Sequence, residues 1–367
     1  MARGAGRVYL HVGLPKTGTT FLQGVLWASR KTLREHGVLY PGPASAHFWA
    51  AQDLTEHLFM GRENRRVPGA WNKLARQARR WSGSAVLSHE LFTLATDAHI
   101  RRVVADLGAA ELHVVLTVRD FERQLPAVWQ EQLKNGGRSS FARHFSQTLE
   151  GDATRSSDPR GFWRQQDAVR ILTLWAEVVP RERIHVITIP QPGAPRDTLW
   201  RRFAQVVGFD ADLVDLASVH TKGNVSLRPP QARLLRRINS KVGDALPPDV
   251  YRSVVKRYLS ESVTGQVHSS TAYGFNAEQR SVARRWSVEL REHLETGGFD
   301  VVGSPSELTT PDTPVVGQRD LDDVPADEEA EAAVAATAAL VRWMADPPAT
   351  TTRRPLRALT GQLRSRG

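Results

Sequence analysis

One short segment carries residue types that can bind a phosphate-like anion. Residues Gly13–Thr20 read Gly-Leu-Pro-Lys-Thr-Gly-Thr-Thr, between a β-rich run and an amphipathic helical pattern. A loop in that place directs backbone N–H groups and the positive end of a helix dipole toward an anion, and its glycines let the backbone approach closely. The alternative is a glycine-containing turn with no ligand, which would not require this run of lysine and hydroxyl side chains.

The spacing of this segment differs from that of a nucleoside-triphosphate loop. The triphosphate pattern is G-x-x-x-x-G-K-[ST], but Thr19 occupies the lysine position and Lys16 lies inside the loop. The segment resembles instead the 5′-phosphosulfate loop, P-K-[TS]-G-T-[TS], of sulfotransferases that use 3′-phosphoadenosine 5′-phosphosulfate (PAPS). The resemblance implies that PAPS is the co-substrate, that Lys16 is catalytic and that no metal ion is needed. The implied donor-binding residues of the loop are Pro15, Lys16, Thr17, Gly18, Thr19 and Thr20.

A second segment also resembles these enzymes. Sulfotransferases of this class have a strand that ends in an arginine, with a serine eight residues later, and both hold the 3′-phosphate. Here Val114–Val118 leads into Arg119, but Ala127 replaces the serine and Phe121 stands where a proline is common. The resemblance therefore implies that Arg119 binds the donor and that the serine contact is lost. Lys222, in a later polar loop, is a further candidate for donor binding, and a solvated surface lysine is the alternative.

Sulfuryl transfer to a hydroxyl group also needs a base that accepts the hydroxyl proton. The run Ala85–Ser88 continues into His89 and Glu90, and ligands of open parallel sheets bind at the carboxyl ends of the strands. In the family that the chain resembles, carbohydrate-directed and bacterial members usually use a glutamate, and cytosolic members use a histidine. We expect Glu90 to be the base, with His89 as the alternative. If neither is the base, Glu90 has the simpler role of stabilising the first turn of the next helix.

The elements that must position these residues alternate between strands and helices. Strand-like runs cover residues 7–12, 38–40, 85–88, 112–118, 184–189 and 299–302. Helical periodicity covers residues 21–33, 163–179, 197–207, 228–242 and 277–296. This alternation predicts an α/β fold, a P-loop-like three-layer sandwich with a central, mainly parallel sheet flanked by helices.

The composition of the chain changes after about residue 308. We assign residues 1–308 to a sulfotransferase domain, 309–325 to an acidic linker, 326–346 to an Ala-rich helix and 347–367 to a disordered basic tail. Residues 311–348 contain nine acids and two arginines, and five arginines with no acid follow them. Because the net charge of the whole chain is +10, the body before this region is strongly basic, which suits an anionic ligand.

Composition also excludes several classes of protein. The 367 residues include no cysteine, so disulfides, thiolate metal sites and cysteine nucleophiles are excluded, and the 41% of hydrophobic residues suffice for a large core. No apolar run approaches the ~18 residues of a membrane span, and no signal-like segment precedes the first strand. We therefore expect a cytoplasmic protein without a membrane span.

Three functions are compatible with these observations. The first is a PAPS-dependent sulfotransferase that moves the sulfuryl group by in-line displacement to a hydroxyl or amine of an unidentified carbohydrate, lipid or small molecule. The second is a P-loop kinase or NTPase, which would need Mg²⁺ and a lysine in place of Thr19. The third is a nucleic-acid-binding protein, which the charge suggests but for which we find no reader motif. Of these we expect the first, with no nucleic-acid partner and with an acceptor pocket lined by residues 47–71 and 134–162.

Overall fold

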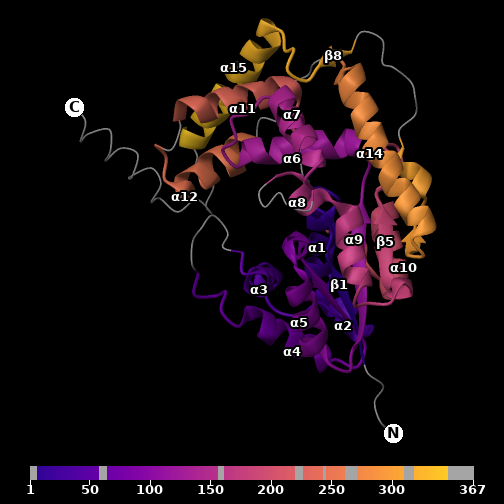
Figure 1. Ribbon diagram of the computed structural model, residues 1–367. Helices are drawn as coiled ribbons and strands as arrows, with labels where there is room; N and C mark the ends of the chain where they lie inside the picture. The colour runs from indigo at the N-terminus through magenta and orange to yellow at the C-terminus, as the bar shows by residue number, and fades with distance from the viewer. Residues whose placement is uncertain are drawn as a thin grey trace. The chain divides into compact units, whose positions relative to one another are not determined.

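The computed structural model describes residues 6–57, 64–155, 161–219, 226–242, 245–260, 271–309 and 318–345. These residues form two compact units (Figure 1). The first unit is drawn from Met1–Gln124, Thr148–Asn224 and Ser281–Pro311. The second unit is drawn from Leu125–Gln147, Val225–Arg280 and Asp312–Gly367.

A parallel six-stranded sheet forms the centre of the first unit. Its strands are β1 (Arg7–His11), β2 (Val38–Leu39), β3 (Ser84–Ser88), β4 (Glu111–Val118), β5 (Ile184–Thr188) and β7 (Asp300–Val302). Their order is β2-β3-β1-β4-β5-β7, and every neighbouring pair is parallel. The predicted α/β fold with a central parallel sheet is therefore confirmed, and each strand begins within one residue of a predicted run.

Helices cover both faces of this sheet, as a three-layer sandwich requires (Figure 1). The chain crosses from β1 to β2 in one direction along the sheet and from β3 through β4 to β5 in the other, so right-handed crossovers lie on opposite faces. The described helices within the first unit are α1 (Thr19–Ala28), α2 (Arg30–Glu35), α3 (Ala46–Thr55), α4 (Ala70–Arg79), α5 (Asp97–Leu107), α8 (Trp163–Gln166), α9 (Ala168–Ala176) and α10 (Thr198–Val207). Its short turns of 3-10 helix are η2 (Glu90–Leu94), η3 (Arg181–Arg183), η4 (Ala211–Leu213) and η6 (Pro305–Leu308). The helices α6 (Phe121–Lys134), α7 (Phe141–Asp152) and α14 (Ala277–Thr296) contribute residues to both units.

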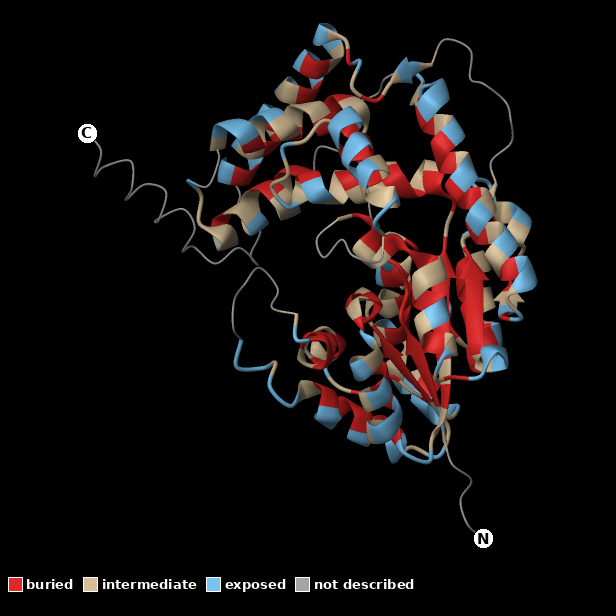
Figure 2. Ribbon diagram, in the orientation of Figure 1, coloured by how far each residue is buried: buried red, intermediate tan, exposed pale blue. Residues whose placement is uncertain are grey.

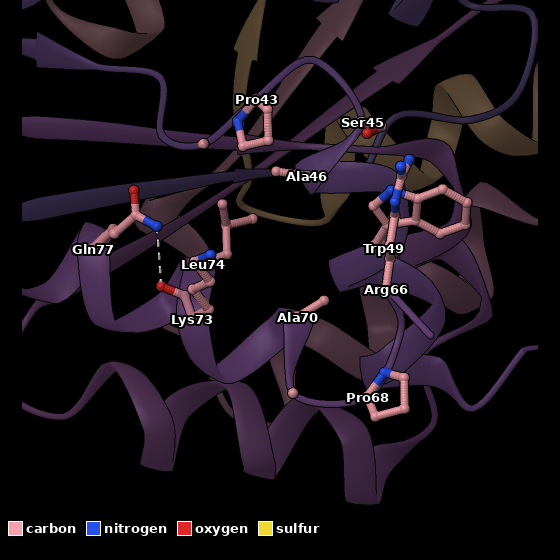
Figure 3. Close-up of a pocket in the computed structure, with 12 residues that line it drawn as sticks. Pro43, Ser45, Ala46, Trp49, Arg66, Pro68, Ala70, Lys73, Leu74 and Gln77 are labelled. Carbon is pink, nitrogen blue, oxygen red and sulfur yellow. Dashed lines mark hydrogen bonds between the residues drawn. The ribbon is translucent and has the colours of Figure 1, made fainter. Parts of the chain in front are cut away.

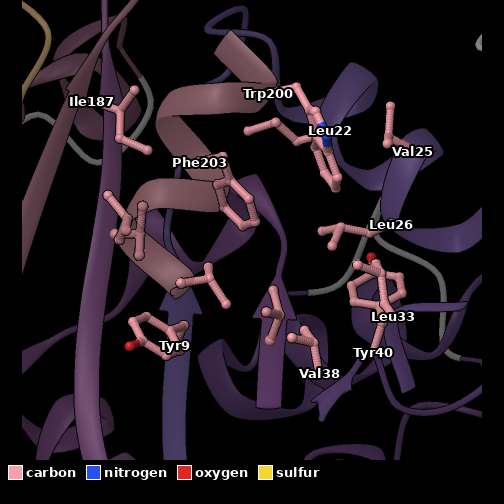
Figure 4. Packing of buried hydrophobic residues seen from close by; sticks show 14 of the residues in the cluster. Tyr9, Leu22, Val25, Leu26, Leu33, Val38, Tyr40, Ile187, Trp200 and Phe203 are labelled. Carbon is pink, nitrogen blue, oxygen red and sulfur yellow. The ribbon is translucent and has the colours of Figure 1, made fainter. Parts of the chain in front are cut away.

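The core of the first unit anchors both ends of the Gly13–Thr20 segment. The four central strands, β1, β3, β4 and β5, are mostly buried (Figure 2), as expected for a parallel sheet covered on both faces. On one face, strand residues pack against α1 and α10 (Figure 4). The cluster includes Tyr9, Val86, Val115 and Ile187 from the sheet, Leu22 and Leu26 from α1, and Trp200 and Phe203 from α10. Because β1 and α1 are both fixed in this cluster, the loop between them has little freedom.

Two predicted helices are interrupted in the structure. The pattern over residues 163–179 is broken at Asp167, whose side chain accepts the backbone N–H of Arg170 at 3.0 Å and so caps α9. The pattern after the Gly13–Thr20 segment is broken at Ser29, between α1 and α2. In both places the apolar spacing continues across the break, so periodicity alone predicts one helix.

The second unit is mainly helical. It includes α11 (Pro229–Val242), α12 (Pro248–Val250), the π-helix η5 (Tyr251–Leu259) and α15 (Ala326–Ala345), with a short parallel pair of β6 (Tyr273–Gly274) and β8 (Arg319–Asp320). α15 packs against α11 and η5 and occupies the Ala-rich stretch. Residues 310–317, which belong to the predicted linker, and residues 346–367, which include the whole of the predicted tail, lie outside the described residues. Nowhere in the described ranges is a helix both long enough and apolar enough to cross a bilayer.

Candidate active site

The loop between β1 and α1 has a strained backbone. Lys16 has φ of 71°, a left-handed conformation that costs a non-glycine residue roughly 1–2 kcal/mol. Gly18 has φ of 83°, and a Cβ atom there would lie 2.5 Å from Leu199 Cδ2. The backbone conformation therefore favours glycine at position 18, and any side chain there would also displace the end of the Leu199 side chain. Strain of this kind at Lys16 is typical of functional sites.

The two threonines at the centre of this loop point their hydroxyl groups toward the protein. The Thr17 hydroxyl donates to the Leu14 carbonyl oxygen at 2.5 Å and lies 2.6 Å from the Thr117 hydroxyl. Thr19 is buried, with its Oγ1 3.5 Å from the same carbonyl oxygen, and Thr20 is exposed. The Thr17 side chain therefore holds the shape of the loop and connects it to β4.

Two buried glutamines hold the loop at Pro15. Gln124 Nε2 lies 2.5 Å from the Pro15 carbonyl oxygen and 2.7 Å from Gln166 Oε1, and Gln166 Nε2 lies 3.3 Å from the same carbonyl. Gln124 and Gln166 are only 1% and 2% exposed. Sequence analysis missed both residues, because they lie far from the loop in the chain and belong to no spacing pattern.

Arg119, which follows the end of β4, forms no ion pair with a carboxylate among the described residues. The neighbouring Asp120 carboxylate accepts the backbone N–H of Arg123 at 2.9 Å and also binds the Arg123 guanidinium group. Arg119 Nε is buried and has no hydrogen-bond partner among the described residues. Burial, and secondly the Arg123 charge, lower the pKa of Arg119 to about 10. A bound anion would relieve both effects, because it would neutralise and hydrogen-bond this cation.

The backbone after β3 distinguishes His89 from Glu90. His89 Nδ1 accepts the backbone N–H of Leu91 at 3.1 Å, so a neutral His89 ring carries its proton on Nε2 and has no free lone pair. Burial lowers the pKa of His89, although the Glu90 charge opposes this effect. Glu90 is the first residue of η2, and its side chain is 33% exposed. Its Oε2 atom is buried, lies 3.9 Å from His89 Nδ1 and has no hydrogen-bond partner among the described residues. Within the described residues, the Glu90 carboxylate therefore keeps an unused acceptor atom, whereas a neutral His89 ring has none.

Buried polar side chains form hydrogen bonds with Ser88, the residue directly before His89. His11 Nδ1 lies 2.8 Å from the Ser88 hydroxyl, and Gln23 Nε2 donates to the Ser88 carbonyl oxygen at 3.0 Å. His47 Nδ1 accepts the Ser88 backbone N–H at 3.2 Å, and its Nε2 lies 2.9 Å from the Pro41 carbonyl oxygen. Burial lowers the pKa of both His11 and His47 to about 3, so both rings are neutral at ordinary pH.

The register of the sheet brings the three candidate segments to one edge. His11 and Ser88, the last residues of β1 and β3, are paired, and His11 is also paired with Val115 of β4. β1 and β3 therefore end side by side, and the neighbouring β4 extends three residues further, to Val118, in the same direction. The Gly13–Thr20 segment, the His89–Glu90 pair and Arg119 each follow one of these strands. This edge is where ligands bind in open α/β sheets. Lys222, the remaining donor-binding candidate, lies outside the described residues.

Comparison with known proteins gives few matches. No protein-family model matches the chain, and no curated protein matches it. Among solved structures, a sulfotransferase from Alicyclobacillus acidocaldarius is similar to 70% of this chain and 98% of its own, with 18% identity and a TM-score of 0.41.

Proposed function

We propose that this protein is a PAPS-dependent sulfotransferase that transfers a sulfuryl group to a hydroxyl or amine of an acceptor. The observation that supports the proposal best is the condition of Arg119: a largely buried arginine with an unpartnered Nε, at the end of the strand next to the strained Pro15–Thr20 loop. A donor with a 5′-phosphosulfate and a 3′-phosphate offers one anion to the loop and one to Arg119.

In the proposed reaction, an acceptor oxygen attacks the sulfur of the donor in line with the leaving phosphate. The Glu90 carboxylate accepts the hydroxyl proton as the new oxygen–sulfur bond forms. The bond from sulfur to the bridging oxygen breaks, and the electron pair stays on the leaving adenosine 3′,5′-bisphosphate. Lys16 and the loop N–H groups stabilise the negative charge that develops on its 5′-phosphate.

The sequence of the loop argues against the second candidate, a kinase or NTPase. In such a loop a lysine after the second glycine reaches the β- and γ-phosphates, whereas Thr19 here is buried, with its Oγ1 close to the Leu14 carbonyl oxygen. No observation favours a nucleic-acid-binding role over binding of a small, highly charged donor.

The experiment that tests this proposal is a calorimetric titration with adenosine 3′,5′-bisphosphate, with 5′-AMP and with ATP plus Mg²⁺. We expect the bisphosphate to bind most tightly. Arg119→Ala should weaken it by about 10- to 100-fold, since a charge-assisted hydrogen bond is lost, and should weaken 5′-AMP much less.

Arg7→Ala is the matched control for this experiment, because Arg7 lies at the opposite end of β1 and its loss removes the same charge. It should leave all three affinities unchanged. Tighter binding of ATP plus Mg²⁺ than of the bisphosphate would overturn the proposal in favour of an NTP enzyme, and equal effects of Arg119→Ala on the bisphosphate and 5′-AMP would remove Arg119 from the 3′-phosphate site.

A further inference from the structure

A cavity of the first unit lies between α3 and α4, outside the Gly13–Thr20 loop. Its volume is about 550 Å³, within the usual range for small-molecule sites. Figure 3 shows side chains from both helices and from the segments before them around this space. The residues that matter for its chemistry are Trp49, Arg66, Lys73, Pro43, Pro68 and Leu74.

The described lining of this pocket carries positive charge. Arg66 and Lys73 line it, and none of its described lining residues is acidic. Within the described ranges, neither cationic side chain makes an ion pair or a hydrogen bond. The acid of α3 is already occupied, because Asp53 accepts the backbone N–H of Gly69 at 3.2 Å and of Trp71 at 2.9 Å. Among the described residues of the lining, an anionic group would therefore meet two cations and no carboxylate.

The rest of the lining suits a flat, apolar surface. The Trp49 ring, two prolines and Leu74 supply apolar atoms, and aromatic rings favour stacking on planar or ring-shaped partners. These atoms leave the polar recognition of a ligand to Arg66 and Lys73.

The same helix connects this pocket to the proposed base. α3 packs against η2, which begins with Glu90. On α3, the Phe48 ring lies 5.4 Å from the His89 ring and 4.7 Å from the Trp49 ring, between ring centroids. The Phe48 ring is therefore in contact both with the Trp49 ring, which lines the pocket, and with the His89 ring, which precedes the proposed base.

We infer that the pocket between α3 and α4 binds a small molecule that carries a negatively charged group and an apolar ring face. This inference does not depend on the proposed function, because it follows from the lining of the pocket. Part of that lining lies within residues 47–71, the first of the two stretches expected to line the acceptor site.

Two probes that share a phenyl ring, one with an anionic group and one neutral, test this inference. Phenyl phosphate and phenyl β-glucoside are titrated calorimetrically into the full chain, without donor. Phenyl phosphate should bind more tightly than the glucoside. Lys73→Gln and Arg66→Gln should each weaken phenyl phosphate by about three- to tenfold, since a partly exposed charge contact is lost, and should change the glucoside little. Arg76→Gln, on α4 but outside the pocket, is the matched control and should change neither.

Trp49→Leu supplies an independent variant, because it removes the ring and keeps both cations; it should weaken both probes. Equal affinity of the two probes for the wild type, or no effect of Lys73→Gln and Arg66→Gln on phenyl phosphate, would overturn the inference. Displacement of phenyl phosphate by adenosine 3′,5′-bisphosphate would also overturn it, because the probe would then occupy the donor site. If the bisphosphate fails to bind while phenyl phosphate binds with the expected pattern, the anion site stands and the proposed sulfotransferase function fails.

Discussion

At the scale of single residues, the hydrogen bonds of the backbone decide which side chains are free to react. His89 and Glu90 are adjacent, and residue type alone allows either to be a base. The His89 ring accepts an N–H from Leu91, whereas Glu90 Oε2 accepts no hydrogen bond within the described part of the chain. The proposal therefore assigns the base to Glu90 and a positioning role to His89, as the N-cap of η2.

Glu90→Gln should lower the turnover number by about 10²- to 10⁴-fold, because the amide keeps the shape of the carboxylate but cannot accept the proton. Binding of adenosine 3′,5′-bisphosphate should stay at the wild-type level. His89→Asn is the comparison variant and should cost less, since its main effect is on the N-terminus of η2. If His89→Asn is inactive and Glu90→Gln turns over normally, the two roles are reversed.

Lys16 combines a strained backbone with a charge, and two variants separate these properties. Lys16→Ala and Lys16→Gly both remove the charge, so each should lower turnover by about 10²- to 10³-fold. Because φ is 71°, only the glycine variant also removes the strain. Lys16→Gly should therefore have a free energy of unfolding about 1 kcal/mol higher than Lys16→Ala, measured by urea denaturation. Equal stabilities would mean that the left-handed conformation of Lys16 costs nothing.

At the scale of elements, the Gly13–Thr20 loop depends on helices that follow much later in the chain. Gln124 of α6 and Gln166 of α8 both bind the Pro15 carbonyl oxygen. Gln124→Ala should weaken adenosine 3′,5′-bisphosphate by about tenfold, because a loop that is no longer held in place must be ordered on binding. Gln165→Ala is the control. It removes the glutamine that precedes Gln166. The Gln165 side chain has no described hydrogen bond to Pro15, so this variant should leave the affinity unchanged. Unchanged affinity in Gln124→Ala would show that β1 and α1 alone fix the loop.

The difference between local patterns and contacts among distant elements explains how much of the structure could be predicted from the sequence. The strands and their parallel arrangement follow from local apolar runs such as Val114–Val118, and the candidate loop follows from the local spacing of Pro15–Thr20. Gln124 could not be found in this way, because its contact with Pro15 joins residues 109 positions apart. The break at Asp167 was missed because one side chain to backbone hydrogen bond overrides an otherwise continuous helical pattern. The roles of Lys16, Glu90 and Arg119 stay predictions.

Within the second unit, α15 is held to α11 by a buried carboxylate. Glu329 is 7% exposed and binds Arg233 at 3.0 Å and Arg237 at 2.5 Å. Removing both arginines leaves an unpaired buried charge, which typically costs about 3–5 kcal/mol, whereas removing the carboxylate leaves two partly exposed cations at lower cost. Urea denaturation should therefore show that Arg233→Ala/Arg237→Ala is less stable than Glu329→Leu. The reverse order would show that Glu329 is solvated in solution.

At the scale of the whole molecule, the buried histidines make the folded state sensitive to acid. His11 and His47 are buried at 0% and 2% exposure, and the chain already carries a net charge of +10 with its histidines neutral. Each further proton adds to the repulsion among these positive charges. A buried imidazolium ion also lacks the hydration that stabilises its charge in water, so the unfolded chain binds protons at these histidines more readily than the folded chain does.

The direction in which stability changes with pH follows from the pKa values of His11 and His47. Burial lowers the pKa of His11 and of His47 from 6.5 to about 3. Above pH 6.5 their contribution to stability is complete, and it declines as the pH falls toward 3. In that range each histidine adds at most about 1.4 kcal/mol per pH unit to the slope of unfolding free energy.

His11→Asn should be less stable than the wild type at pH 7.5, because it loses its contact with the Ser88 hydroxyl. Between pH 6 and pH 4, its unfolding free energy, measured with urea at each pH, should fall less steeply. His47→Asn should behave in the same way, and slopes equal to that of the wild type in both variants would show that neither histidine is kept neutral by the fold.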